Sequence, residues 1–377
     1  MTDTTETTTP TRPAPAAGRR LPGADRARAF TEPPPAPPRP AGHGDLPDVL
    51  ADPDPDPDPV VSWDRFAEEP SGPTEVLAQQ GWVPPAPPEP PAEWGRRRTV
   101  LRVLSLGLAT PKPGKEELAH RHNVRAIRQA TWPRSVRIAV TNPKGGSGKT
   151  PTAVILGGLL AGIRGGSVAI WDAADAAGTL GGRTEGIAAR CVSDIDADPD
   201  GYAAPSTVGM VAATQTSFAD VLGSLREREF TADSITRVAG VLDRTYRISV
   251  ADTGNVPHSP AFTQVIGLAD ILVVPTTLTA DSVNKAVALL RRLQDTPIGL
   301  AAHAVVAVLH TRGPQTPGLA EQVNGIFGNA GVGAVVDIPF DPHIAAGTAI
   351  SISSLTHASR VAWTRLAAAT VANLTVN

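Results

Sequence analysis

The residues best suited to chemistry lie in the glycine-rich segment 143–150, which reads Pro-Lys-Gly-Gly-Ser-Gly-Lys-Thr. Glycines in such a segment let the backbone amides turn inward and cradle phosphate oxygens. Lys149 can reach the β- and γ-phosphates of a nucleotide, and the Thr150 hydroxyl can bind Mg2+. The alternative is a glycine-rich turn with incidental lysines, but the spacing favours nucleotide binding. The predicted phosphate contacts are Gly145, Gly146, Ser147, Gly148, Lys149 and Thr150.

Two aspartates end apolar segments further along the chain. Asp252 closes segment 248–252, and Asp172 closes segment 168–172. At the carboxyl end of a strand, Asp252 can hold Mg2+ through water, opposite Thr150. Asp172 would face the same site from the neighbouring strand. Either aspartate alone could equally serve an ordinary turn, so the metal role depends on the glycine-rich segment. The predicted metal ligands are therefore Thr150 and Asp252.

These side chains need strands and helices to position them, and the pattern from residue 136 onward provides both. Continuous apolar segments alternate with helical periodicity, which predicts a doubly wound α/β fold with a mostly parallel sheet. The predicted strands are 136–140, 167–171, 247–251, 270–274, 304–309 and 334–338. The predicted helices are 116–129, 150–163, 218–226, 235–242, 261–268, 280–293, 319–327 and 358–374. The glycine-rich segment thus joins a strand to a helix, as a phosphate-binding loop requires.

The segment Lys-Gly-Gly-Ser-Gly-Lys-Thr (144–150) resembles the deviant Walker A motif of the ParA/MinD family of ATPases. The resemblance extends over residues 136–377, a P-loop ATPase domain, through Val-Ala-Ile-Trp-Asp, Ile-Ser-Val-Ala-Asp-Thr-Gly, Asp-Ile-Leu-Val-Val-Pro-Thr and Asp-Ile-Pro-Phe-Asp-Pro-His-Ile. It implies that the domain binds ATP with Mg2+ and dimerises with ATP bound. The resemblance also implies that Lys144 reaches across the dimer to the partner's nucleotide. Pro339 and Asp341 would lie beside the adenine.

One departure from the family pattern concerns hydrolysis. The family has Asp-x-Asp after the second strand, and the second aspartate positions the attacking water. Here the run is Asp172-Ala-Ala-Asp175, so Ala174 occupies that place. Either Asp175 substitutes from one residue further on, or hydrolysis is slow. The predicted catalytic residues are Lys144, Lys149, Asp172 and Asp175. Pro151 is tolerated in the first turn of a helix and belongs to the predicted nucleotide site.

The first quarter of the chain has a different composition. Residues 1–91 hold 23 of the 38 prolines, and residues 1–95 carry 7 basic and 16 acidic side chains. Such a segment lacks the apolar surface for a core, so we expect 1–95 to be a disordered, acidic, proline-rich region. Residues 96–135 are expected to form a basic linker and helix. The tail, the stretch Leu-Ser-Leu-Gly-Leu (104–108) and the ATPase together resemble actinobacterial MinD-like proteins associated with type VII secretion.

The composition also indicates the compartment in which the protein works and the partners it could bind. The single cysteine, the lack of a secretory signal at the start and the lack of a long apolar segment predict a cytoplasmic protein without stable membrane insertion. Residues 96–137, with 11 basic and 2 acidic side chains, could contact an anionic partner such as nucleic acid or lipid, or could equally hold the acidic tail. Arg291 and Arg292 are further candidates for DNA phosphate contacts.

Three functions remain open at this point. The first is an ATPase switch for chromosome or plasmid partitioning or for positioning a cellular complex. The second is an accessory ATPase of a type VII secretion system, with the proline-rich tail as a docking arm for a secretion or partition partner. The third is a nucleotide-binding module with little turnover.

Overall fold

The computed structural model describes residues 90–94, 112–176, 178–188, 190–224, 229–294, 299–313 and 316–374. All of these belong to one compact unit, residues 88–377. The predicted disorder of the proline-rich region concerns residues that, apart from 90–94, lie outside this description. The stretch 104–108 also lies outside it.

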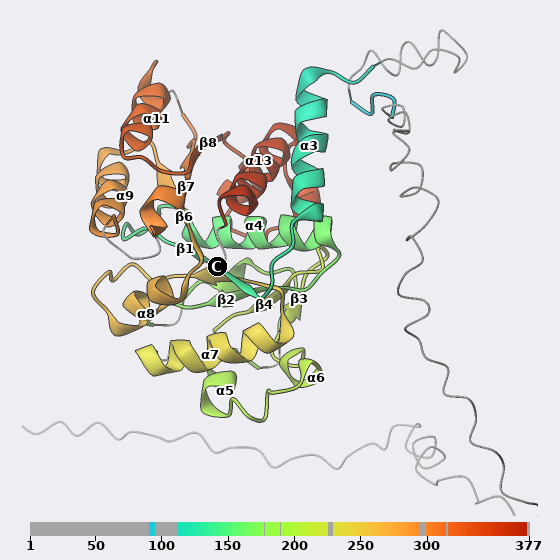
Figure 1. The fold of residues 1–377 in the computed structure, drawn as a ribbon, viewed down its shortest axis with the longest axis vertical. Coiled ribbons are helices and arrows are strands. Elements are labelled where there is room, and N and C mark those ends of the chain that lie inside the picture. The colour runs from blue at the N-terminus through green and yellow to red at the C-terminus, as the bar shows by residue number, and fades with distance from the viewer. Residues whose placement is uncertain are drawn as a thin grey trace, which may run out of the picture. The chain divides into compact units, whose positions relative to one another are not determined.

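Within the described residues, eight strands form one sheet in the order β3-β4-β2-β5-β1-β6-β7-β8 (Figure 1). Neighbouring strands are parallel except for β3, which is antiparallel to β4. The strands are β1 (Val136–Val140), β2 (Val168–Asp172), β3 (Ala213–Thr214), β4 (Asp220–Leu222), β5 (Ile248–Asp252), β6 (Ile271–Thr277), β7 (Val305–Leu309) and β8 (Ala334–Ile338). The predicted doubly wound, mostly parallel α/β fold is confirmed.

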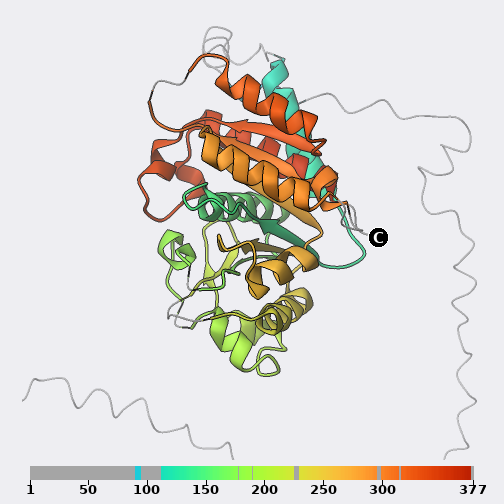
Figure 2. The same ribbon diagram turned by 90° about the vertical axis from the view of Figure 1, so that its left-hand side faces the viewer.

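Helices cover both faces of this sheet (Figures 1 and 2). One face packs against α3 (Lys115–Gln129), α4 (Lys149–Arg164) and α13 (His357–Asn373). The other packs against α5 (Val192–Ala197), α6 (Pro205–Val208), α7 (Ala232–Thr245), α8 (Pro260–Leu268), α9 (Ala280–Arg292), α10 (Leu300–His303) and α11 (Leu319–Asn329). Short turns η3 (Leu180–Arg183), α12 (Pro342–Ala345) and η4 (Ile352–Ser354) complete the described elements. Strand residues are apolar on both sides because both sides are covered.

Helix α4 carries the end of the glycine-rich segment, and a glycine sets how closely it approaches the sheet. A Cβ atom on Gly157 would lie 2.6 Å from Cδ1 of Ile170 on β2. The bare backbone therefore lets α4 lie directly on β2 and β5. This contact holds the N-terminus of α4 beside the carboxyl ends of those strands.

The predicted helix 218–226 is wrong, because this segment contributes to an edge hairpin instead. Residues 220–222 form β4, which pairs with β2, while 225–228 lie outside the described residues. Phe218 has a φ of 66°, which no right-handed helix accepts. The Tyr246 hydroxyl donates a hydrogen bond to Asp220 Oδ2 at 2.9 Å and ties the hairpin to the end of α7. Pairing with β2 thus overrides the local helical pattern.

Helix α3 lies against α13 and α4 rather than apart from them. Ile127 is fully buried in this contact, and the Arg164 guanidinium donates to the carbonyls of Ile127 and Ala130 at 2.7 and 2.8 Å. The Arg164 guanidinium also stacks 5.0 Å from the Trp132 ring. None of the helices formed by the described residues has both the length and the apolar character needed to cross a bilayer.

Candidate functional site

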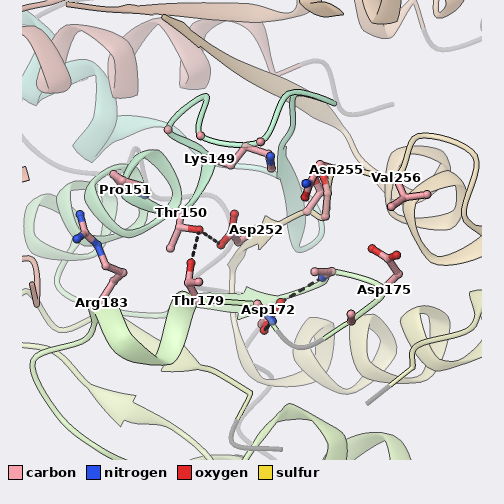
Figure 3. Close-up of a pocket in the computed structure, with 18 of the residues that line it drawn as sticks. Lys149, Thr150, Pro151, Asp172, Asp175, Thr179, Arg183, Asp252, Asn255 and Val256 are labelled. Carbon is pink, nitrogen blue, oxygen red and sulfur yellow. Dashed lines mark hydrogen bonds between the residues drawn. The ribbon is translucent and has the colours of Figure 1, made fainter. Parts of the chain in front are cut away.

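The carboxyl ends of β1, β2 and β5 border a cavity of about 780 Å3 (Figure 3). Strands β2 and β5 pair in register, so Asp172 lies beside Asp252. Strand β1 flanks β5 and leads through the glycine-rich loop into α4. Ligands of open α/β sheets bind at this edge. The predicted site residues that line the cavity are Gly145, Gly146, Gly148, Lys149, Thr150, Pro151, Asp172, Asp175 and Asp252.

The loop has the backbone geometry of an anion cradle. Gly146 and Gly148 have φ angles of 76° and 92°, in the region that side-chain-bearing residues rarely adopt. Gly148 is the N-cap of α4, so the free amides of the first turn face the cavity with the positive end of the helix dipole. Lys149 Nζ donates to the carbonyls of Asn142 at 3.0 Å and Lys144 at 3.2 Å. Burial lowers the pKa of Lys149.

Thr150 and Asp252 meet where a metal ion is expected. The Thr150 hydroxyl donates to Asp252 Oδ2 at 2.7 Å and lies 3.5 Å from the Thr179 hydroxyl (Figure 3). Burial raises the pKa of Asp252 to about 7, and the neighbouring Asp172 adds to the effect, while Thr150 and Lys149 oppose it. A divalent cation would supply the positive charge that this buried carboxyl lacks.

The donor set fits a magnesium–nucleotide complex. Asp252, which lines the cavity, has its Oδ1 atom buried without a hydrogen-bond partner. A buried carboxylate oxygen normally has a partner, which a ligand, water or ion can supply. Carboxylate and hydroxyl oxygens are the ligands that Mg2+ takes, usually with several waters. Thr150 and Asp252 would therefore hold the ion, which when bound would neutralise charge on the phosphate oxygens.

Asp172 organises the loop that follows β2. Its Oδ1 accepts the Ala174 amide at 3.2 Å, and its Oδ2 accepts the Gly178 amide at 2.8 Å and the Ser224 hydroxyl at 2.5 Å. The carboxylate is fully buried. Asp172 thus lines the cavity while fastening the backbone of residues 174–178.

Ala174 and Asp175 both line the cavity, and both approach Gly254 after β5. A Cβ atom on Gly254 would lie 3.5 Å from the Ala174 Cβ and would collide with Asp175 Oδ1. The Asp175 carboxylate therefore reaches the backbone of segment 252–254. Only the absence of a side chain at Gly254 permits this approach.

The sequence reasoning missed several lining residues, among them the polar side chains of Thr179, Arg183 and Asn255 (Figure 3). Thr179 follows Gly178 closely after β2, and Asn255 directly follows the Asp-Thr-Gly segment 252–254, so their positions could have suggested both. Arg183 belongs to η3, and its guanidinium donates to the Ile344 carbonyl at 3.0 Å. Burial lowers the pKa of Arg183. No local pattern marks Arg183.

Pro339 and Asp341 lie away from this cavity and line a second one of about 330 Å3. The two cavities share Gly146, Gly148 and Pro151, so they adjoin across the loop. The Asp341 carboxylate accepts the His343 amide at 2.9 Å and both the amide and the hydroxyl of Thr356 at 2.9 and 3.0 Å. Burial would raise the pKa of Asp341, but these hydrogen bonds outweigh it and hold the pKa below its usual value.

Lys144 stands outside the phosphate cradle. Its ammonium forms a 2.6 Å ion pair with Asp281, in the first turn of α9, and both side chains remain partly exposed. The Lys144 amide donates to Asn142 Oδ1 at 2.9 Å, which fixes the backbone at the start of the loop. The two lysines of the motif therefore point to different surroundings, Lys149 inward and Lys144 toward α9.

The candidate DNA contacts are only in part available. Arg134 pairs with Asp270 at 2.7 Å, and Arg137 pairs with Asp243, so these two cations serve the fold. Arg291 and Arg292 are exposed in the last turn of α9, where the Arg292 guanidinium lies 3.1 Å from His258 Nδ1. Residues 96–111 of the basic block lie outside the described residues.

Comparisons with known proteins agree with this geometry. Residues 138–257 match the model of the CobQ/CobB/MinD/ParA nucleotide binding domain. The chain is 26% identical over 294 residues to the ESX-1 secretion-associated protein EspI, in two strains of Mycobacterium tuberculosis. That match covers 74% of this chain but 40% of the relative. The structure of a ParA family ATPase from Chlorobium tepidum TLS has the same fold, with a TM-score of 0.52 and 14% identity, over 62% of this chain and 98% of that one.

The predicted resemblance is confirmed at the level of the domain. Residues 138–257 are similar to the CobQ/CobB/MinD/ParA nucleotide binding domain, and the chain shares its fold with the ParA family ATPase structure. The chain spans about 40% of the length of the curated relatives it matches.

Proposed function

We propose that the protein is a Mg2+- and ATP-dependent switch that hydrolyses ATP and dimerises when ATP is bound. The position of Lys144 carries this proposal. An ammonium beside the phosphate loop but outside its cradle, held by an exposed ion pair, is free to serve the nucleotide of a second subunit. In this role Lys144 would exchange Asp281 for the phosphates of its partner.

The chain's own residues divide the work of hydrolysis in this proposal. The loop amides and Lys149 would bind the phosphates and stabilise the charge that develops during transfer. Thr150 and Asp252 would hold the ion, and Asp172 would keep the loop after β2 in place. Asp175, which reaches Gly254, would orient the attacking water in place of the aspartate that Ala174 replaces.

The second cavity supports a site for the base. Pro339 and Asp341 line it, and it adjoins the first cavity across the glycine-rich loop. The Asp341 carboxylate is already occupied by Thr356 and His343. We therefore assign this region's contact with adenine to the backbone and to Pro339.

The output of the switch would be the positioning of a cellular complex or of DNA in the cytoplasm. Arg291 and Arg292 would supply phosphate contacts in the second case. The similarity to EspI favours a second candidate, an accessory ATPase of a type VII secretion system. There the region 1–95 would act as the docking arm, 96–135 as linker and helix, and 136–377 as the ATPase. A nucleotide-binding module with little turnover is the third candidate.

Light scattering of the full chain with and without Mg-ATP tests the switch. We expect ATP to convert a monomer into a dimer, Lys144→Ala to abolish the dimer while retaining nucleotide binding, and Lys149→Ala to abolish binding itself. A monomer under both conditions would refute the dimeric switch. Unchanged nucleotide affinity in Lys149→Ala would refute the phosphate site.

A second experiment separates the outputs. In the DNA case, Arg291→Ala/Arg292→Ala would weaken binding of random-sequence duplex DNA and reduce its dependence on salt. In the secretion case, DNA binding would be weak throughout, and affinity capture from the native cell would yield secretion components only with residues 1–95 present. Bound nucleotide without phosphate release would favour the third candidate.

A further inference from the structure

Residues 90–94 lie against α3 through their backbone. The Arg121 guanidinium donates to the carbonyls of Pro90 at 2.8 Å and Pro91 at 2.7 Å. Glu117 accepts the amide of Glu93 at 2.6 Å and that of Trp94 at 3.3 Å. The Arg121 cation therefore binds two successive backbone carbonyls, and the Glu117 carboxylate binds two successive backbone amides. The prolines have no amide to offer, so this division suits a Pro-Pro-x-x-Trp segment.

The pair that makes these contacts is itself preorganised. Glu117 and Arg121 stand one helical turn apart on α3 and form a 2.6 Å ion pair. The Glu117 side chain is only 3% exposed. Burial would raise the pKa of Glu117, but the two amides and Arg121 outweigh it and hold the pKa below its usual value. Without the segment, the Glu117 carboxylate would lose two of its three hydrogen-bond donors.

Side chains add specificity to this backbone recognition. The Trp94 ring lies 4.9 Å from the His120 ring on α3 and 4.4 Å from the His357 ring at the start of α13, the latter edge to face. Ala92 is 5% exposed, so a larger residue there would not fit without displacement. The segment thus places the Trp94 ring between α3 and α13 at its C-terminal end and buries the small residue Ala92 in its middle.

We propose that the α3–α13 surface formed by Glu117, Arg121, His120 and His357 is a peptide-recognition site. Its ligand is this chain's own segment 90–94, bound in cis. The segment is then an intramolecular ligand that fixes the end of the proline-rich region on the nucleotide-binding domain. Any partner held by residues 1–89 would be tethered at this point.

Hydrogen exchange of the full-length chain tests the occupancy of the site. We expect slow exchange of the Glu93 and Trp94 amides in the wild type. Loss of a charged partner should speed it about 10- to 100-fold in Glu117→Gln and Arg121→Ala. Glu116→Ala and Arg125→Ala change exposed neighbours on the same helix and should leave the exchange unaltered. Exchange at the rate of an unstructured peptide in the wild type would overturn the proposal.

Binding of a labelled peptide of residues 86–96 tests recognition in trans. Full-length Trp94→Ala, whose own segment has lost its aromatic anchor and competes less, should bind this peptide about 10- to 100-fold more tightly than the wild type. The double variant Trp94→Ala/Glu117→Gln should lose that binding. Equal binding by the single and double variants would overturn the site. Amide protection that disappears on dilution would overturn occupancy in cis and assign the segment to a second copy.

Discussion

Replacing Asp175 tests which residue orients the attacking water. Its carboxylate lines the phosphate cavity and reaches Gly254, whereas Ala174 has no polar side-chain atom. Groups that position or activate a nucleophile contribute about 100-fold or more to turnover. Asp175→Ala should therefore lower kcat about 100-fold, equivalent to about 2.7 kcal/mol in the activation free energy. The affinity for Mg-ATP should stay unchanged, because Asp175 lies outside the glycine-rich loop.

Ala174→Asp alone should not accelerate hydrolysis. Both positions approach the same glycine, so the variant would place two carboxylates side by side. At about 5 Å and an effective dielectric constant of about 20, two like charges repel by about 3 kcal/mol, enough to offset the gain of a second positioning group. The double variant Ala174→Asp/Asp175→Ala removes this repulsion and should recover turnover to within about tenfold of the wild type.

Steady-state phosphate release and equilibrium binding of a non-hydrolysable ATP analogue measure the two effects separately. Asp200→Ala, which removes an exposed carboxylate far along the chain from the loop, provides the control and should match the wild type. Turnover of Asp175→Ala within about threefold of the wild type would refute the role of Asp175, because the effect expected of such a group is much larger. Loss of analogue binding would point instead to a collapsed site.

Further predictions concern assembly, packing and pH. Asp281→Asn frees Lys144 and should strengthen ATP-dependent dimerisation about two- to fivefold in sedimentation equilibrium; weaker association would mean that Asp281 itself supports the dimer. Gly157→Ala forces a methyl group into the sheet and should reduce the free energy of unfolding by about 1–3 kcal/mol. Denaturant titration measures this, and Gly240→Ala, which meets open space, should not destabilise the protein. The pKa of Asp252 is raised to about 7 in the folded, metal-free protein, above its value of 3.8 in the unfolded chain. The stability that this group contributes is therefore present at low pH and is lost as the pH rises toward 7. Mg2+ should therefore displace a proton from Asp252 below about pH 7, which calorimetry in buffers of different ionisation enthalpy would detect; a heat independent of buffer would contradict the raised pKa.

The elements that build the candidate nucleotide site follow from local sequence patterns. Strands β1 and β5 and helix α4 are continuous apolar segments bounded by polar residues or glycine. Such patterns can be recognised from neighbouring residues alone. The glycine-rich loop is equally local, since its glycines, Lys149 and Thr150 are consecutive. Asp252 could be placed because parallel strands bring their carboxyl ends to one edge of the sheet.

Other features depend on contacts between segments far apart in the chain. The predicted helix 218–226 failed because hydrogen bonds to β2 and to Tyr246 decide the conformation of its first half. The three donors to Asp172 come from two separate segments, so its part in shaping the loop after β2 appears only once the chain is folded.

The sequence by itself determined the α/β fold, the glycine-rich loop between a strand and a helix, and the position of Asp252 at a strand end, because short-range periodicity and strand ends encode them. Only the tertiary structure decided that Asp175 reaches Gly254, that Lys144 pairs with Asp281 and that residues 90–94 lie on α3. The physical reason is the same in each case. A charged or aromatic side chain takes the orientation in which its partners offset the cost of removing it from water. Those partners lie in segments far away in the sequence, and no local pattern predicts which of them will meet.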